Sequence, residues 1–260
     1  MRRSLGIIAA ALSIGFAGAA HATPSTILMI PSVDVQPFGV VHFGADIYSP
    51  PAKGTSNGTN TDGGHNIVVY GLTVGAIPAD DKFGMEVGVD YKDFSGNSMN
   101  PLYLNAKLGV KEGAFGEMSP AVAVGGYDFG TKSATSATNT ADFRTDNNIM
   151  YGLVAKTFGA AGRFSVGYFS GNDKVLTDST GKKDATGLLA AWEKTLNDKW
   201  WVAVDYMGSK SSYGCLNLGF AYTVSEKSSF IIGYNIYNDK DIGGKNMNGD
   251  TIEFNYDVNF

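Results

Sequence analysis

The last ten residues of the chain, TIEFNYDVNF (251–260), alternate strictly between apolar and polar side chains. The even-numbered residues from Ile252 to Phe260 are apolar, and the odd-numbered residues from Glu253 to Asn259 are polar. Successive side chains of a β-strand point to opposite faces, so this segment has one wholly apolar face and one wholly polar face. We expect a strand with an apolar environment, either a protein core or a lipid bilayer, on one side only.

The N-terminus has the features of a secretory signal peptide. Two basic residues, Arg2 and Arg3, precede the apolar run LGIIAAALSIGFAGAA, and Ala20-His21-Ala22 supplies a small-x-small cleavage site. A membrane anchor is the alternative, but the run is short, is interrupted by glycine and lacks a basic flank after it. We therefore expect residues 1–22 to be removed, so that the mature protein begins at Thr23.

Composition excludes several classes of protein. The formal net charge is −5, and an acidic exported chain is a poor nucleic-acid binder, so we expect no nucleic-acid partner. The single cysteine, Cys215, cannot form an internal disulfide. No apolar run of about 18 residues follows the signal peptide, which excludes transmembrane helices.

The pattern of the last ten residues recurs along the chain, separated by clusters of Gly, Asn, Asp, Ser and Pro, which are typical of turns. The recurrences predict twelve strands. They span residues 39–49, 65–77, 83–94, 101–110, 120–130, 147–158, 163–171, 185–196, 199–209, 214–224, 229–237 and 251–260.

The connections between these strands alternate between mostly long and mostly short. Long loops at one end, tight turns at the other and an even strand number are typical of an outer-membrane barrel. A soluble β-sandwich is the competing architecture, but its strands average about half the length of these. The sequence therefore predicts an all-β fold, a transmembrane antiparallel up-and-down β-barrel of about 12 strands that spans residues 39–260.

The whole pattern resembles the bacterial outer-membrane β-barrel superfamily, and in particular a small porin-like barrel. TIEFNYDVNF is similar to the C-terminal assembly signal of those proteins, an alternating strand that ends in Phe. The resemblance implies a location in the bacterial outer membrane, with lipid and the barrel-assembly machinery as partners. It also implies that Tyr256, Val258 and Phe260 belong to the assembly signal.

Residues 23–38 stand apart from the strand pattern. Pro31 and Pro37 would interrupt a hydrogen-bonded ladder, so a thirteenth strand is not expected. We expect an extended N-terminal segment that lies in the periplasm or enters the lumen.

Alternation also predicts which polar residues face the inside of the barrel. Acidic residues outnumber lysines on this face, and acidic rings in a pore favour cations. Glu86 is expected beside Lys107 on the next strand, and Asp128 is assigned inward although its segment has small apolar residues on both faces. The expected pore-lining residues are His42, Asp46, Glu86, Asp90, Lys92, Lys107, Lys156, Glu193, Asp205, Glu253 and Asp257.

The leading functional hypothesis is a narrow passive diffusion channel for small polar or cationic solutes, in which glycine-rich walls keep the bore open. The alternative is a structural or adhesive barrel whose lumen is filled by its own side chains. Barrels of eight strands tend to be filled and those of sixteen open, so a count of twelve does not decide between the two.

An outer-membrane hydrolase is a third hypothesis, and it has few candidate residues. The mature chain has only His42 and His65 for general-base chemistry, with Asp62 beside His65. The loop DKDIGGKNMNGD has three carboxylates but lacks the spacing of a calcium loop. We therefore expect no catalytic residue, no metal site and no cofactor.

Overall fold

The computed structural model describes residues 25–50, 55–56, 59–60, 66–77, 82–94, 101–130, 145–241 and 250–260. The expected signal peptide, residues 1–22, lies outside these ranges. No helix in the described part of the chain is long and apolar enough to cross a membrane.

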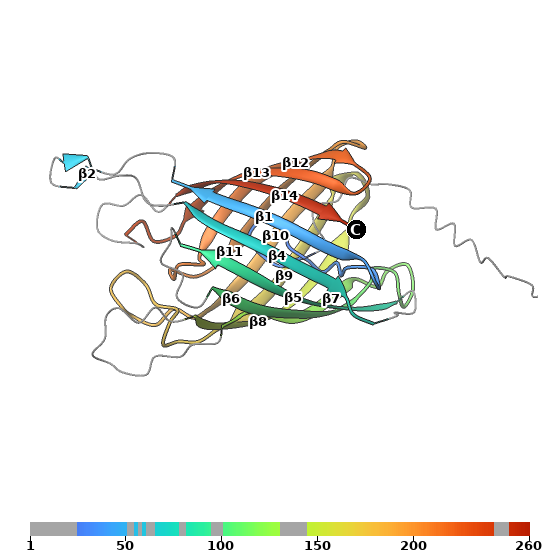
Figure 1. Cartoon of the computed structure of the whole chain (residues 1–260). Helices are drawn as coiled ribbons and strands as arrows, with labels where there is room; N and C mark the ends of the chain where they lie inside the picture. The colour runs from blue at the N-terminus through green and yellow to red at the C-terminus, as the bar shows by residue number, and fades with distance from the viewer. Residues whose placement is uncertain are drawn as a thin grey trace, which may run out of the picture.

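Twelve long antiparallel strands close into a single barrel (Figure 1), which confirms the predicted fold class and strand number. Each barrel strand pairs with the barrel strand that follows it in the chain, and the barrel closes where β14 pairs with β1. Two short strands, β2 (Thr55–Ser56) and β3 (Thr59–Asn60), pair with each other in the connection after β1. The barrel strands are β1 (Val41–Ser49), β4 (Ile67–Gly75), β5 (Phe83–Asp93), β6 (Leu102–Val110), β7 (Ala121–Gly130), β8 (Asp146–Thr157), β9 (Arg163–Ser170), β10 (Thr186–Thr195), β11 (Trp200–Met207), β12 (Cys215–Ser225), β13 (Ser228–Tyr237) and β14 (Thr251–Asn259).

The seam places the start of β1 and the end of β14 at the same end of the barrel. His42 is the register partner of Asn259, and the Phe260 N–H donates to the Val41 carbonyl at 2.8 Å. Antiparallel order puts the ends of β4, β6, β8, β10 and β12 at this end as well. The connection 158–162 contains a single 3₁₀ turn, η1 (Gly159–Ala161).

The outer surface of the barrel is apolar along its length. Outward-facing side chains such as Leu104, Met150 and Val166 are more than half exposed. Aromatic rings gather near the end with the short connections, where the ring centroids of Trp200 and Tyr222 are 4.9 Å apart. An apolar band with aromatic residues toward its edge is what lipid around an outer-membrane barrel requires.

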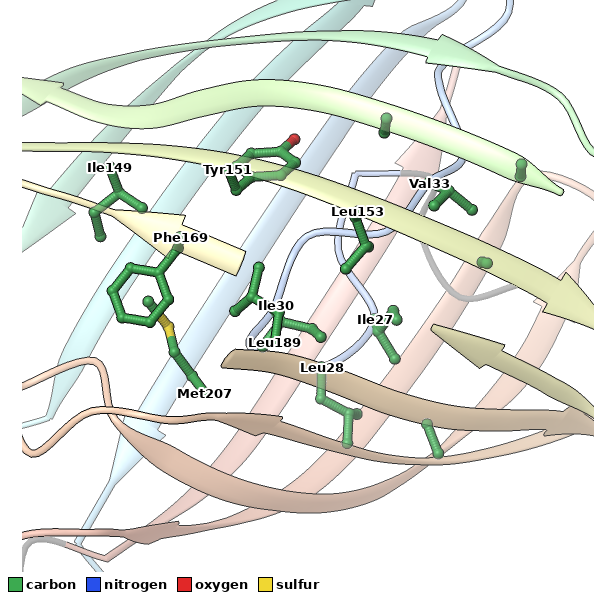
Figure 2. Packing of buried hydrophobic residues seen from close by; sticks show 14 of the residues in the cluster. Ile27, Leu28, Ile30, Val33, Ile149, Tyr151, Leu153, Phe169, Leu189 and Met207 are labelled. Atoms are coloured by element: carbon green, nitrogen blue, oxygen red, sulfur yellow. The ribbon is translucent and has the colours of Figure 1, made fainter. Parts of the chain in front are cut away.

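Residues 25–37, which we call the lumen segment, lie inside the barrel (Figure 2). The segment is bent rather than continuously extended, because the Ser32 N–H donates to the Ser25 carbonyl at 3.2 Å. Its apolar side chains Ile27, Leu28, Ile30 and Val33 are at most 3% exposed. Burying each such side chain contributes about 1.5–3 kcal/mol. They belong to one cluster with inward-facing residues of β8–β11, among them Ile149, Leu153, Phe169, Leu189 and Met207.

Glycines on the inner wall make room for the lumen segment. A Cβ atom on Gly109 would be 2.5 Å from Val35 Cγ2, and one on Gly219 would be 2.6 Å from Leu28 Cδ2. A Cβ atom on Gly75 would be 2.0 Å from the Pro37 carbonyl oxygen. The expectation that glycine-rich walls keep the bore open is therefore wrong at these positions, where the missing side chains are replaced by the segment.

Replacing Gly109 with alanine should destabilise the barrel by about 1–3 kcal/mol, because the added methyl group overpacks the contact with Val35. Gly152→Ala is the matched control, since its Cβ atom would meet only Val124 Cγ1 at 3.9 Å. The free energy of unfolding, measured by urea titration of the protein in lipid vesicles, tests this. Equal losses in the two variants would show that the segment does not pack against Gly109.

Candidate functional site: the barrel lumen

The lumen has two chemically different sides. The inward residues of β8–β11 are mainly apolar and contact the lumen segment. The inward residues of β1, β4, β5, β6 and β14, which we call the polar wall, carry most of the charged groups that alternation assigned to the pore. Some of the predicted pore-lining residues hold the segment, some line the remaining space, and Glu86 and Lys107 do both.

Asp205 on β11 holds the first turn of the lumen segment. One carboxylate oxygen, Oδ2, accepts hydrogen bonds from the backbone N–H groups of Leu28 at 2.8 Å, Met29 at 3.0 Å and Ile30 at 3.2 Å. The other oxygen accepts from the Asn217 side-chain amide. Asp205 is completely buried, and hydrogen bonds to a charged group of about 1.5–3 kcal/mol each offset the cost of that burial.

Arg163, at the start of β9, joins the segment to Glu193 on β10. Its Nη1 and Nη2 atoms donate to the two Asp34 oxygens at 2.8 and 2.5 Å, and its Nε donates to Glu193 at 2.8 Å. The Trp201 ring nitrogen donates to the second Glu193 oxygen at 3.1 Å. Arg163 was not among the expected pore-lining residues, although its parity with Ser165 places it inward.

The expected Glu86–Lys107 pair is confirmed, with 3.0 Å between Lys107 Nζ and Glu86 Oε1. Both residues also hold the segment. Glu86 accepts from the Gln36 N–H at 2.8 Å, and the Lys107 ammonium donates to the Ser25 carbonyl at 3.1 Å.

Lys156 differs from its expected orientation. On β8 the buried inward residues include Leu153 and Ala155, so Lys156 shares the outward face with Val154. Its Nζ lies 3.0 Å from Glu112 and donates to the Glu117 carbonyl at 2.7 Å, both in the connection 111–120. The prediction was wrong because the inward face of β8 packs against the lumen segment, so here the apolar face points inward.

A cavity of about 1150 Å³ lies between the lumen segment and the polar wall. Ser25, Met29 and Pro31 border it on the segment side. Glu193, Asp205 and Glu253 are buried away from it, the first two in the contacts above and Glu253 beside Asn255. The predicted pore-lining residues that border the cavity are His42, Asp46, Glu86, Asp90, Lys92, Lys107 and Asp257.

Asp128 reaches the same cavity through a backbone irregularity. It has a positive φ of 56° at a register shift between β7 and β8, and this turns its side chain inward beside that of Tyr127. Lys92 Nζ lies 2.6 Å from Asp128 Oδ1, and the Tyr213 hydroxyl donates to the same carboxylate. Asp128 and Glu86 are thus each neutralised by a lysine.

The candidate hydrolase residues are placed only in part. His42 lies in the lumen with Nε2 3.3 Å from Asp257 Oδ1, and its Nδ1 contacts the Asn259 side chain at 3.0 Å. His65 and Asp62 lie outside the described residues. Within the described ranges, no group of three or more His, Cys, Asp or Glu residues is placed to hold a metal ion.

No protein-family model matches the chain, and no curated protein sequence matches it. Solved structures with a similar arrangement include the following two. An outer membrane channel from Pseudomonas putida F1 shares 12% identity over 87% of this chain and 97% of its own, with a TM-score of 0.48. The KdgM porin shares 8% identity over 85% and 98%, with a TM-score of 0.45. At identities this low, no functional residue is carried over from either protein.

Replacing Asp205 with alanine should free the first turn of the lumen segment, because three backbone N–H groups lose their acceptor. We expect amide hydrogen exchange at residues 28–30 to accelerate by about tenfold or more. Hydrogen–deuterium exchange mass spectrometry of the peptide 25–37 measures this. Glu253→Gln is the control, because Glu253 is equally buried but makes no hydrogen bond to the segment within the described structure. Similar exchange in both variants would contradict the anchoring role.

Proposed function

We propose that the protein is a narrow passive diffusion channel of the bacterial outer membrane for small polar or cationic solutes. The observation that carries this proposal is the cavity of about 1150 Å³ with a charged wall inside a closed barrel. The apolar outer surface supports the membrane location. The function is non-enzymatic, since solutes would move down their own concentration gradient.

The permeation route runs along one side of the lumen, between the segment and the polar wall. In the register of the sheet, Asp257 pairs with Gly44, Gly44 with Gly71, and Gly71 with Asp90. In this row, one carboxylate lies on each side of two adjacent glycines. Because the glycines have no side chains, the lumen is open above them. The next row contributes Asp46, one pleat nearer the long connections.

These carboxylates give the route its preference for cations. Asp46, Asp90 and Asp257 border the cavity, and no lysine forms an ion pair with them in the described structure. In a narrow lumen, partial exclusion of water makes each charge act more strongly than on an open surface. Asp205 and Glu253, which lie outside the cavity, would contribute little to selectivity.

Replacing Asp46, Asp90 and Asp257 together with asparagine should move the reversal potential in a KCl gradient toward zero. Planar-bilayer recordings of the purified protein measure this potential, and Glu253→Gln is the matched control with a buried carboxylate outside the cavity. Selectivity should also weaken at high salt, because exposed charges are screened over about 8–10 Å at physiological ionic strength. An unchanged reversal potential with conductance intact would remove these residues from control of permeation.

A structural or adhesive barrel is the second candidate function. It is favoured by the lumen segment, which fills the apolar side of the lumen and is held there by Asp205 and Arg163. Absence of conductance from protein that migrates as a folded, heat-modifiable barrel would support this candidate over the channel.

We further propose that Tyr256, Val258 and Phe260 form the signal recognised by the barrel-assembly machinery. Phe260 is 69% exposed on the outside, beside the seam between β1 and β14. Phe260→Lys should strongly reduce the amount of assembled barrel, whereas Phe260→Tyr should retain it, because an aromatic ring suits the membrane interface. The fraction of heat-modifiable protein in the outer-membrane fraction measures this. Equal fractions for the two variants would exclude the role.

A further inference from the structure

We infer that the cavity binds an organic cation with an apolar body, whose ammonium group is held between Asp46 and Asp257. This inference rests on the proposed function in one respect, namely that the cavity lies on the permeation route, and it names the class of solute that the route retains.

Two carboxylates face a common space above Gly44. A Cβ atom on Gly44 would be 3.2 Å from Asp257 Oδ1 and 3.8 Å from Asp46 Oδ1. Asp46 forms no hydrogen bond or ion pair with any residue that the structure describes, and it borders the cavity. The carboxyl group of Asp46 is therefore available to a solute, unlike those of Glu86 and Asp128, which are paired with lysines.

Two further acceptors on the adjoining strand have no partner. Asp257 Oδ2 and Asn255 Oδ1 are buried without a hydrogen-bond donor among the described residues. Their residues are 6% and 4% exposed and border the same cavity, and Asn255 is the register partner of Asp46. His42 Nε2 lies beside Asp257 Oδ1, so the unpaired acceptors are Asp257 Oδ2 and Asn255 Oδ1. An ammonium group carries three donors and no acceptor, so it can donate to both of them and to Asp46.

The rest of the cavity suits an apolar body attached to that ammonium group. Tyr48, Tyr103, Tyr127, Tyr151, Tyr213 and Tyr237 border the cavity. The Lys92 ammonium already lies 4.9 Å from the Tyr103 ring centroid and 5.9 Å from that of Tyr213, so the cavity accommodates a cation over aromatic faces. Cavities for small molecules occupy about 300–1,000 Å³, so this one holds a single small solute with some water.

The same contacts exclude two other classes of solute. An anion would need a free cationic partner, but the Lys92 and Lys107 ammonium groups are each bound to a carboxylate. A metal ion would need three or more converging ligands, which the described residues do not provide. An organic cation needs only one or two carboxylates and an apolar surface.

Isothermal titration calorimetry of the full-length protein in detergent tests the inference, with tryptamine as the probe. Indole-3-ethanol is the neutral analogue and indole-3-acetate the anionic one. We expect tryptamine to bind at least about tenfold more tightly than either analogue, as one lost charge-assisted hydrogen bond implies. Binding of the neutral analogue with equal affinity would overturn the inference, and this comparison needs no variant.

Two substitutions locate the site. Asp46→Asn should weaken tryptamine binding by about tenfold or more, for the same reason. Asp173→Asn is the control, because Asp173 pairs with Lys183 in an exposed connection and should leave binding unchanged. Equal affinity in the wild type and in Asp46→Asn would overturn the assignment of Asp46.

Equilibrium binding in detergent does not depend on conduction, so the two proposals fail separately. Tryptamine binding without conductance would reject the channel and retain the cation site. Cation-selective conductance without tryptamine binding would retain the channel and reject the site.

Discussion

Closure of the sheet between β1 and β14 is the constraint on which the rest of the structure depends. The seam pairs eight consecutive residues of each strand and leaves no open edge, so the barrel backbone can be hydrogen-bonded within lipid. Once the sheet is closed, alternation sends one side chain of every pair to lipid and the other to the lumen. A twelve-strand barrel encloses more space than its own inward side chains fill, and the chain uses its N-terminal segment to occupy one side of that space.

Sequence alone predicted the strands well because both faces of most strands have distinct chemistry. In β14 the apolar residues face outward and the polar residues face the lumen. The same alternation therefore predicts both that the segment is a strand and which of its faces points into the lumen. The same rule failed at Lys156, where the lumen side of β8 is apolar because Leu153 packs against the lumen segment. The same alternation places Arg163 on the lumen side of β9 with Ser165, so the rule would have identified it.

The roles of the inward charges could not be predicted, because they depend on contacts between distant parts of the chain. Leu28 and Asp205 are separated by 177 positions, and nothing local to either residue indicates that one binds the other. Glu86, Glu193 and Asp205 resemble Asp46 and Asp257 in the sequence pattern. The structure distinguishes the two groups, because the first holds the segment or its partners, whereas Asp46 and Asp257 make no hydrogen bond to the segment and border the cavity.

The lumen segment also has a mechanical consequence. In the strand order, β9–β11 lie across the barrel from β1, β4 and β5. The segment is bonded to both sides, to Arg163 and Asp205 on one side and to Glu86 on β5 on the other. Because the segment is bonded to both sides, it links opposite walls of the barrel and restrains the distance between them. The width of the cavity is therefore set by a short length of polypeptide as well as by the number of strands.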